Sequence, residues 1–136
     1  MTTPILRTAS LIAVVAATLV ARPTAHHSFA MYDGSKPLTL HGRVVTYRWT
    51  NPHSMFTVMA DSDGATWAVE LSSPSNMTRL GWTRTTLAAG DRVEVSVSPM
   101  RDGSKGAACR QLRFLDKDVM LECGAGTAIR AGEKVN

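Results

Sequence analysis

The sequence lacks the short motifs that mark common hydrolases and nucleotide-dependent enzymes. It contains no Gly-x-Ser-x-Gly, no Walker-type Gly-Lys-Ser and no His-Glu-x-x-His. Neither of its two cysteines, Cys109 and Cys123, neighbours a histidine in a nucleophile pattern. Carboxylates spaced for acid–base work are also missing, because Asp61 and Asp63 fall in a tight turn. These absences favour a binding protein over an enzyme.

The sequence also lacks an apolar run long enough to cross a membrane. The run at residues 11–21 is short, whereas a spanning helix needs about 20 residues. Arg7 precedes this run and the small residue Ala25 follows it. That order is typical of a secretory signal peptide, here residues 1–25. We therefore expect a periplasmic or secreted protein without a stable membrane span after cleavage; an uncleaved interfacial anchor is the alternative.

The cleavage position stays open between two sites. A cut after Ala25 produces a mature chain that begins with His26 and His27, but Pro23 stands where a small residue is preferred. A cut after Ala21 is the competing choice. The position matters because only the first cut places a free α-amine on a histidine.

The predicted mature protein carries little net charge. The whole chain has 136 residues and a net charge of +4, but the signal peptide contains Arg7 and Arg22 and no acidic residue. Without it, 13 basic and 11 acidic residues leave a charge of +2. This balance, on an exported protein, argues against nucleic acid as a partner. About 110 residues suffice to bury a modest core in one domain.

The two cysteines lie symmetrically about Asp116. A hairpin that turns at residues 116–118 would bring Cys109 opposite Cys123, and an oxidising compartment favours a disulfide between them. Closing a loop of about 15 residues would contribute about 3 kcal/mol in the chain-entropy model. Two unpaired thiols at strand ends are the alternative.

Short strands and turns account for most of the mature chain. Residues 26–37 contain turn chemistry and predict an extended N-terminal arm, and residues 124–136 predict a loose tail. Gly42 predicts a bulge or a bend in the long first strand. Ser75 or Asn76 can cap a short helix at 76–82, which Gly81 would end. The predicted strands are 38–49, 54–60, 66–72, 92–98, 109–115 and 119–122.

This order predicts a mainly β protein built as a small OB-like barrel over residues 38–123. Such a barrel has five antiparallel strands and one short helix between strands 3 and 4. Another small antiparallel barrel or a sandwich is the alternative.

Three histidines suggest a metal site. After a cut behind Ala25, His26 offers an α-amine and an imidazole, and His27 or His53 can supply a third nitrogen. Nitrogen ligands in a tetragonal array suit Cu(II), so copper is the candidate cofactor, with zinc as a further option. The alternative is that His26 and His27 are solvated.

A second candidate site lies at the connection between the first two strands. Trp49, Asn51 and His53 occupy this connection, which borders the usual ligand face of OB barrels. Glu70 is an acid within the third strand, and it can pair with Arg48 or with His53. The sequence thus predicts a ligand site at Trp49, Asn51, His53 and Glu70.

Motifs in a fixed order resemble those of a family of uncharacterised exported bacterial proteins. The resemblance spans roughly residues 26–121. It rests on His-His-Ser-Phe at 26–29, Trp-Thr-Asn-Pro-His at 49–53, Leu-Gly-Trp at 80–82, Gly-Asp-x-Val at 90–93 and Pro-x-Arg-Asp-Gly at 99–103. It implies export and a fold class, and no reaction.

The sequence therefore predicts an exported, non-enzymatic binding module. Its partner would be a small molecule, a metal ion or another exported protein. A copper-binding carrier that uses His26, His27 and His53 is the alternative function, and an oxidative enzyme at the same copper is a third.

Overall fold

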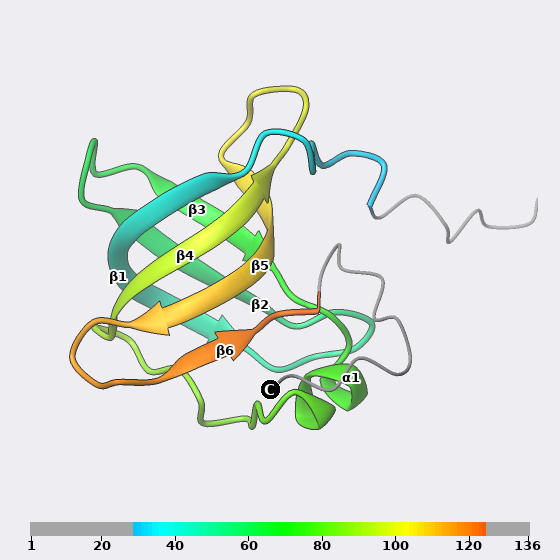
Figure 1. The fold of residues 1–136 in the computed structure, drawn as a ribbon, viewed down its shortest axis with the longest axis vertical. Helices are drawn as coiled ribbons and strands as arrows, with labels where there is room; N and C mark the ends of the chain where they lie inside the picture. The colour runs from blue at the N-terminus through cyan, green and yellow to red at the C-terminus, as the bar shows by residue number, and fades with distance from the viewer. Residues whose placement is uncertain (1–28, 125–136) are drawn as a thin grey trace, which may run out of the picture.

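The computed structural model describes residues 29–124, which form a small β barrel with one short helix (Figure 1). The predicted signal peptide, His26, His27 and the tail from residue 125 lie outside the described residues. Within 29–124, no helix is long and apolar enough to cross a membrane. The elements are β1 (Leu38–Arg48), β2 (Met55–Ala60), β3 (Thr66–Glu70), α1 (Pro74–Arg79), β4 (Arg92–Pro99), β5 (Gly106–Phe114) and β6 (Met120–Glu122).

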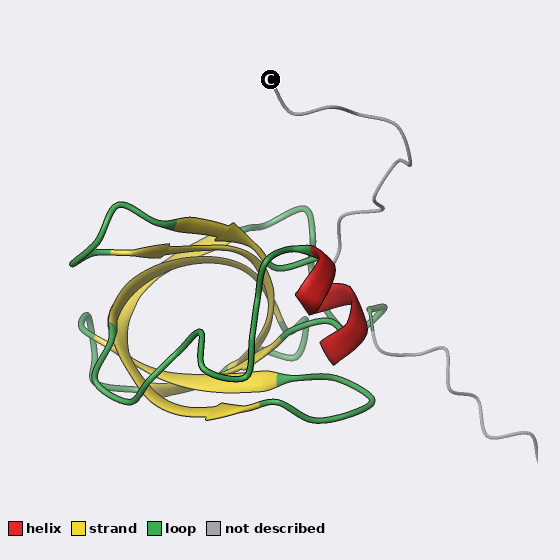
Figure 2. Cartoon of the chain, turned by 90° about the horizontal axis from the view of Figure 1, so that it is seen from below, coloured by secondary structure: helices red, strands yellow, loops and turns green. Residues whose placement is uncertain are grey.

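The strands close into a barrel, which confirms the predicted OB-like fold class. The sheet order is β3-β2-β1-β4-β5-β6, and a parallel pairing between β3 and β5 joins the two sides. Five strands, β1 to β5, thus form the ring seen in Figure 2, with α1 beside it. The short β6 is added to the outer edge of β5. Closure leaves β1 to β4 without a free edge along most of their length.

Alternation along the strands decides which side chains fill the barrel. Val93, Val95 and Val97 of β4 are fully buried, as the alternating pattern predicted. Trp67 and Val69 of β3 are buried as well. The intervening side chains point outward, and Glu70, the last residue of β3, is among them. The outward position of Glu70 is what makes it available to a surface site.

The close approach of two strands explains the glycine in β1. Gly42 pairs with Ala60 of β2 on one side and Val93 of β4 on the other. A Cβ at Gly42 would overlap the carbonyl oxygen of Met59. The register irregularity of β1 lies between Val44 and Thr46, so of the two predictions for Gly42, a bulge or a bend, the bulge is wrong.

The helix begins earlier than the sequence predicted. It runs from Pro74 to Arg79, and the side chain of Ser73 accepts a hydrogen bond from the Asn76 amide at 3.4 Å. Pro74 is well suited to the first turn because its missing N–H has no partner there. The predicted caps, Ser75 and Asn76, therefore lie inside the helix. Gly81, at φ 87°, follows its end as expected.

The predicted disulfide is present. Cys109 and Cys123 are bonded, are fully buried and have Cα atoms 5.5 Å apart. The indole N–H of Trp82 donates to the carbonyl oxygen of Glu122 at 2.8 Å. These two contacts attach β6 to the barrel and to the chain that follows α1.

β5 begins at Gly106, three residues before the predicted start. Gly106 and Ala107 pair in parallel with Ala68 and Val69 of β3. This long-range pairing extends the strand, and no local alternation reveals it.

Candidate functional site

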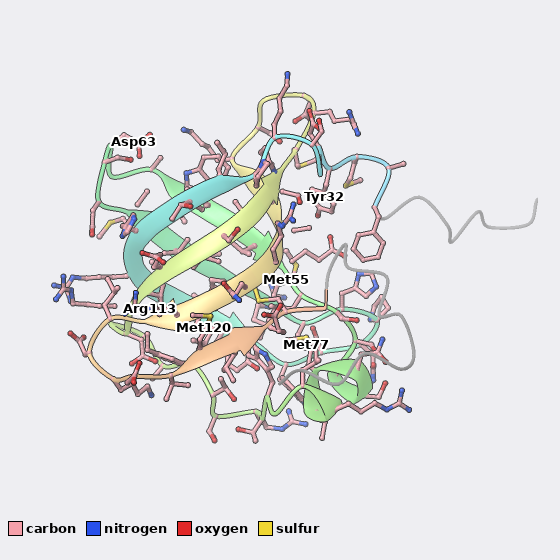
Figure 3. All side chains as sticks on the ribbon, in the orientation of Figure 1. Tyr32, Met55, Asp63, Met77, Arg113 and Met120 are labelled. Atoms are coloured by element: carbon pink, nitrogen blue, oxygen red, sulfur yellow. A yellow bond between two sulfur atoms is a disulfide. The ribbon has the colours of Figure 1, made fainter. Side chains whose placement is uncertain are left out.

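The N-terminal arm from Phe29 to Pro37 lies across the β4–β5 end of the barrel. Tyr32 forms an isolated bridge with Met100, and the Asp33 amide donates to the carbonyl oxygen of Pro99 at 2.7 Å. Figure 3 shows Tyr32 below the arm. Its side chain is 8% exposed and packs against Ala108, which lies on the outer face of β5. The arm therefore covers part of the barrel's outer surface.

Two arginines fasten the arm to the barrel. Arg101 donates from Nε to the carbonyl oxygen of Ala30 at 3.2 Å, and its guanidinium lies 3.8 Å from the carboxylate of Asp33. Arg110 of β5 donates from Nη1 to the carbonyl oxygen of Gly34 at 3.2 Å. The positions of the arm and of both guanidinium groups are thus mutually fixed.

The carboxylate of Glu70 joins the arm to the first inter-strand loop. Its Oε2 accepts a hydrogen bond from the Tyr32 hydroxyl, and its Oε1 lies in contact with Nδ1 of His53. The side chain of Glu70 is 14% exposed and that of His53 is 30% exposed. One acid therefore links the buried phenol of Tyr32 to the partly exposed imidazole of His53.

The environment of Tyr32 keeps its hydroxyl protonated. Burial raises the pKa of Tyr32 well above its ordinary value, and the hydrogen bond to Glu70 and the nearby negative charge act in the same direction. The phenol is consequently a neutral hydrogen-bond donor to Glu70 at physiological pH.

An aromatic ring from the arm lies against His53. The rings of Phe29 and His53 have centroids 6.3 Å apart and are tilted by 38°. Phe29 remains substantially exposed. Phe29 and Tyr32 are not predictable as site residues from the sequence, because an arm without periodicity gives no sign of which side chains turn toward the barrel.

The structure brings together two of the four predicted ligand residues. His53 and Glu70 are in contact, which was one of the two pairings considered for Glu70. Trp49 instead packs edge to face against Tyr47, with ring centroids 6.1 Å apart. Asn51 lies exposed in the loop and is joined to Pro52 by a cis peptide bond.

A pocket of about 310 Å3 lies beside this cluster, between the arm and the barrel wall. It shares two aromatic side chains with the cluster, and Arg110 is the one charged residue in its lining. The lining consists of Phe29, Tyr32, Gly34, Ser98, Ala108 and Arg110.

No three histidine, cysteine or acidic side chains are grouped to hold a metal ion within residues 29–124. Of the three predicted metal ligands, only His53 falls in that range. His41 lies elsewhere, on β1, and its Nε2 is 3.7 Å from the carboxylate of Glu94.

A model of a family of unknown function, DUF6152, matches residues 13–109, which is more than half of the chain. The chain belongs to this family. The DUF6152 match ends at Cys109, inside β5, and so stops short of the predicted limit at residue 121. Membership confirms the resemblance to an uncharacterised family and brings no activity with it.

The other comparisons add little. No curated protein matches the chain. Among solved structures, the mitochondrial single-stranded DNA binding protein Rim1 from S. cerevisiae matches with a TM-score of 0.42 and 15% identity, over 62% of this chain and 97% of that one. A likeness at this level supports no inference, and the fold assignment rests on the strand pairing described above.

Proposed function

We propose that the protein is an exported, non-enzymatic binding module whose ligand site lies where the arm meets the end of β3. The observation that carries this proposal is the contact of Glu70 with both Tyr32 and His53 beside a pocket. Tyr32 joins the two features, because it lines the pocket and its hydroxyl is bonded to Glu70. Small-molecule sites combine an apolar lining with a few polar groups. Of the ligand residues predicted from the sequence, the proposed site keeps His53 and Glu70. Tyr32 and Phe29 of the arm join them.

Export is supported by two independent features. The first is the signal-like order of residues 1–25, and the second is the disulfide between Cys109 and Cys123, a bond typical of oxidising compartments. Intact-mass measurement of the protein recovered from the periplasm or medium tests export directly. We expect a mass that lacks residues 1–25 and two thiol hydrogens; full-length protein retained in the cytoplasm would contradict export.

Binding is tested by mapping NMR shift changes with a panel of anionic, neutral and cationic small molecules. We expect the largest changes at His53, Glu70 and Tyr32, and weaker binding in His53→Gln. The chain offers a matched control in His41→Gln, because His41 also pairs with a glutamate but lies on β1. Shifts confined to the turn at 115–118 would argue against the site.

A copper-binding carrier is the second candidate, and the contact between His53 and Glu70 favours it. A histidine that ligates a metal commonly donates its other ring N–H to a carboxylate, a backbone carbonyl or water. With Nδ1 directed to Glu70, Nε2 of His53 is left without a hydrogen bond among the described residues. The ring centroids of Phe29 and His53 are 6.3 Å apart, and three residues of chain reach about 10 Å, so His26 and His27 are close enough in sequence to contribute.

The copper proposal has a sharp test at the mature N-terminus. Cu(II) titration should show tight binding by protein beginning at His26, and loss of that binding when one extra residue precedes it, because the α-amine then moves away. His53→Gln should weaken binding and His41→Gln should not. Equal Cu(II) affinity with and without the extra residue would show that the α-amine is not a copper ligand.

A further inference from the structure

The floor of the pocket is built from small side chains. Ser98 of β4 and Ala108 of β5 are direct cross-strand partners, and both are almost fully buried. Larger side chains at these positions would fill the space between the arm and the barrel. Tyr32 and Phe29 stand over this floor as aromatic walls, and the backbone of Gly34 completes the rim.

Arg110 is an uncompensated positive charge in this pocket. Its guanidinium donates to the carbonyl oxygen of Gly34, which fixes its position, and most of its five N–H donors have no side-chain or backbone acceptor within residues 29–124. Within residues 29–124 no carboxylate lies within 4 Å of it.

The acidic groups of the arm and of β3, Asp33 and Glu70, already have partners. Asp33 accepts hydrogen bonds from Ser35 and faces Arg101, and these contacts hold its pKa below the usual range. Glu70 is held by Tyr32 and His53. Both carboxylates therefore have partners other than Arg110 among the described residues.

We propose that this pocket binds a small planar organic anion, an aromatic carboxylate, with its carboxylate on Arg110 and its ring beside Phe29 and Tyr32. The inference rests on the proposed function and names its ligand class. The planar fork of an arginine matches a carboxylate in two parallel hydrogen bonds. Aromatic walls favour a planar apolar body. The volume of about 310 Å3 lies at the lower end of the range for small-molecule sites.

Benzoate, benzamide and inorganic phosphate separate the contributions to binding. Benzoate has both ring and charge, benzamide has the ring alone, and phosphate has charge alone. In NMR titrations of the exported protein we expect saturable benzoate binding with shifts at Phe29, Tyr32, Ser98, Ala108 and Arg110. Benzamide and phosphate should each bind at least tenfold more weakly, because each lacks one of the two recognised parts.

Two arginines of the same strand provide a matched pair of variants. Arg110→Gln should weaken benzoate binding at least tenfold. Arg113→Gln removes the same charge from an exposed position on β5. Figure 3 shows Arg113 on the other side of the view from Tyr32. Benzoate binding by this variant should therefore be unchanged. Arg110→Lys keeps the charge without the fork and should restore part of the affinity. Phe29→Ala should weaken benzoate and leave phosphate unaffected.

Several results would overturn the inference. Equal binding of benzoate and benzamide, unchanged affinity in Arg110→Gln, or absence of any benzoate shift in the pocket would each do so. If a neutral compound or Cu(II) shifts His53 and Glu70 while benzoate does not, the ligand class is wrong and the proposed binding function stands. If no compound of any charge shifts His53 or Glu70, the proposed function fails with it.

Discussion

The hydroxyl of Tyr32 donates to the carboxylate of Glu70 across 38 residues of sequence, and this bond attaches the arm to β3. The rest of the arm contacts β4, β5 and the loop between them. Glu70 lies on the opposite side of β5 from β4, because Ala108 of β5 pairs with Glu70 on one side and with Ser98 of β4 on the other. The bond therefore connects the arm to a third strand, β3, and places it beside the loop that carries His53.

Alkaline titration should reveal the environment of both tyrosines. The pKa values of Tyr32 and Tyr47, the two tyrosines of the chain, are raised by burial, and Glu70 raises that of Tyr32 further. The folded state therefore keeps phenol protons that the unfolded state loses above pH 10, so the free energy of unfolding should fall as pH rises past 10. Tyr32→Phe should reduce the dependence of the unfolding free energy on pH. Urea unfolding between about pH 9 and 11, which brackets the ordinary tyrosine pKa of about 10, measures this. Tyrosinate absorbance appearing at the ordinary pKa in the folded protein would contradict the prediction.

Removing the carboxylate of Glu70 should destabilise the protein more than removing an exposed one. Glu70→Ala leaves the buried Tyr32 hydroxyl and the His53 imidazole without their partner, at a cost of about 1–3 kcal/mol. Glu94→Ala breaks a pair in which both side chains are exposed to solvent, and it should cost less than about 0.5 kcal/mol. Urea unfolding of the two variants measures the difference. Equal costs would show that the Glu70 contacts contribute no net stability.

Loss of the disulfide should lower stability through the unfolded state. The bond closes a loop with a sequence separation of 14, for which the chain-entropy model gives about 3 kcal/mol. Replacing both cysteines by alanine adds a packing loss, because both are fully buried. Chemical unfolding of the oxidised protein and the double variant tests this. Matching midpoints would mean that the disulfide adds nothing to the stability of the barrel.

Gly42 should be intolerant of the smallest side chain. A methyl group there meets the Met59 backbone, which cannot move without disturbing the β1–β2 pairing. We expect Gly42→Ala to cost about 1–3 kcal/mol, the range for overpacking. Gly34→Ala is the control, because a Cβ at Gly34 meets nothing within 4 Å. Thermal unfolding of both variants gives the comparison, and equal melting temperatures would refute the close approach at Gly42.

The barrel was predictable because alternation and turn chemistry agree along the chain. Val93, Val95 and Val97 alternate with polar residues, and each lies inside as expected. The helix start was missed because Ser73 and Pro74 fit a strand stop as well as a capped first turn. Local sequence cannot separate those two interpretations.

The candidate site was predictable only in part. The pairing of His53 with Glu70 follows from one strand and one adjacent loop, so the sequence could suggest it. The contributions of Tyr32, Phe29 and Arg110 depend on how the arm folds back over the barrel, which is a long-range event. Trp49 was placed with His53 because they are near in sequence, but its ring extends the packing around Tyr47.

The parallel pairing of β3 with β5 also determines when the barrel can form. Glu70 pairs with Ala108, which is made much later. One edge of β3 therefore stays unpaired until most of the polypeptide has been synthesised. Before that point the strands of the ring cannot cover one another completely.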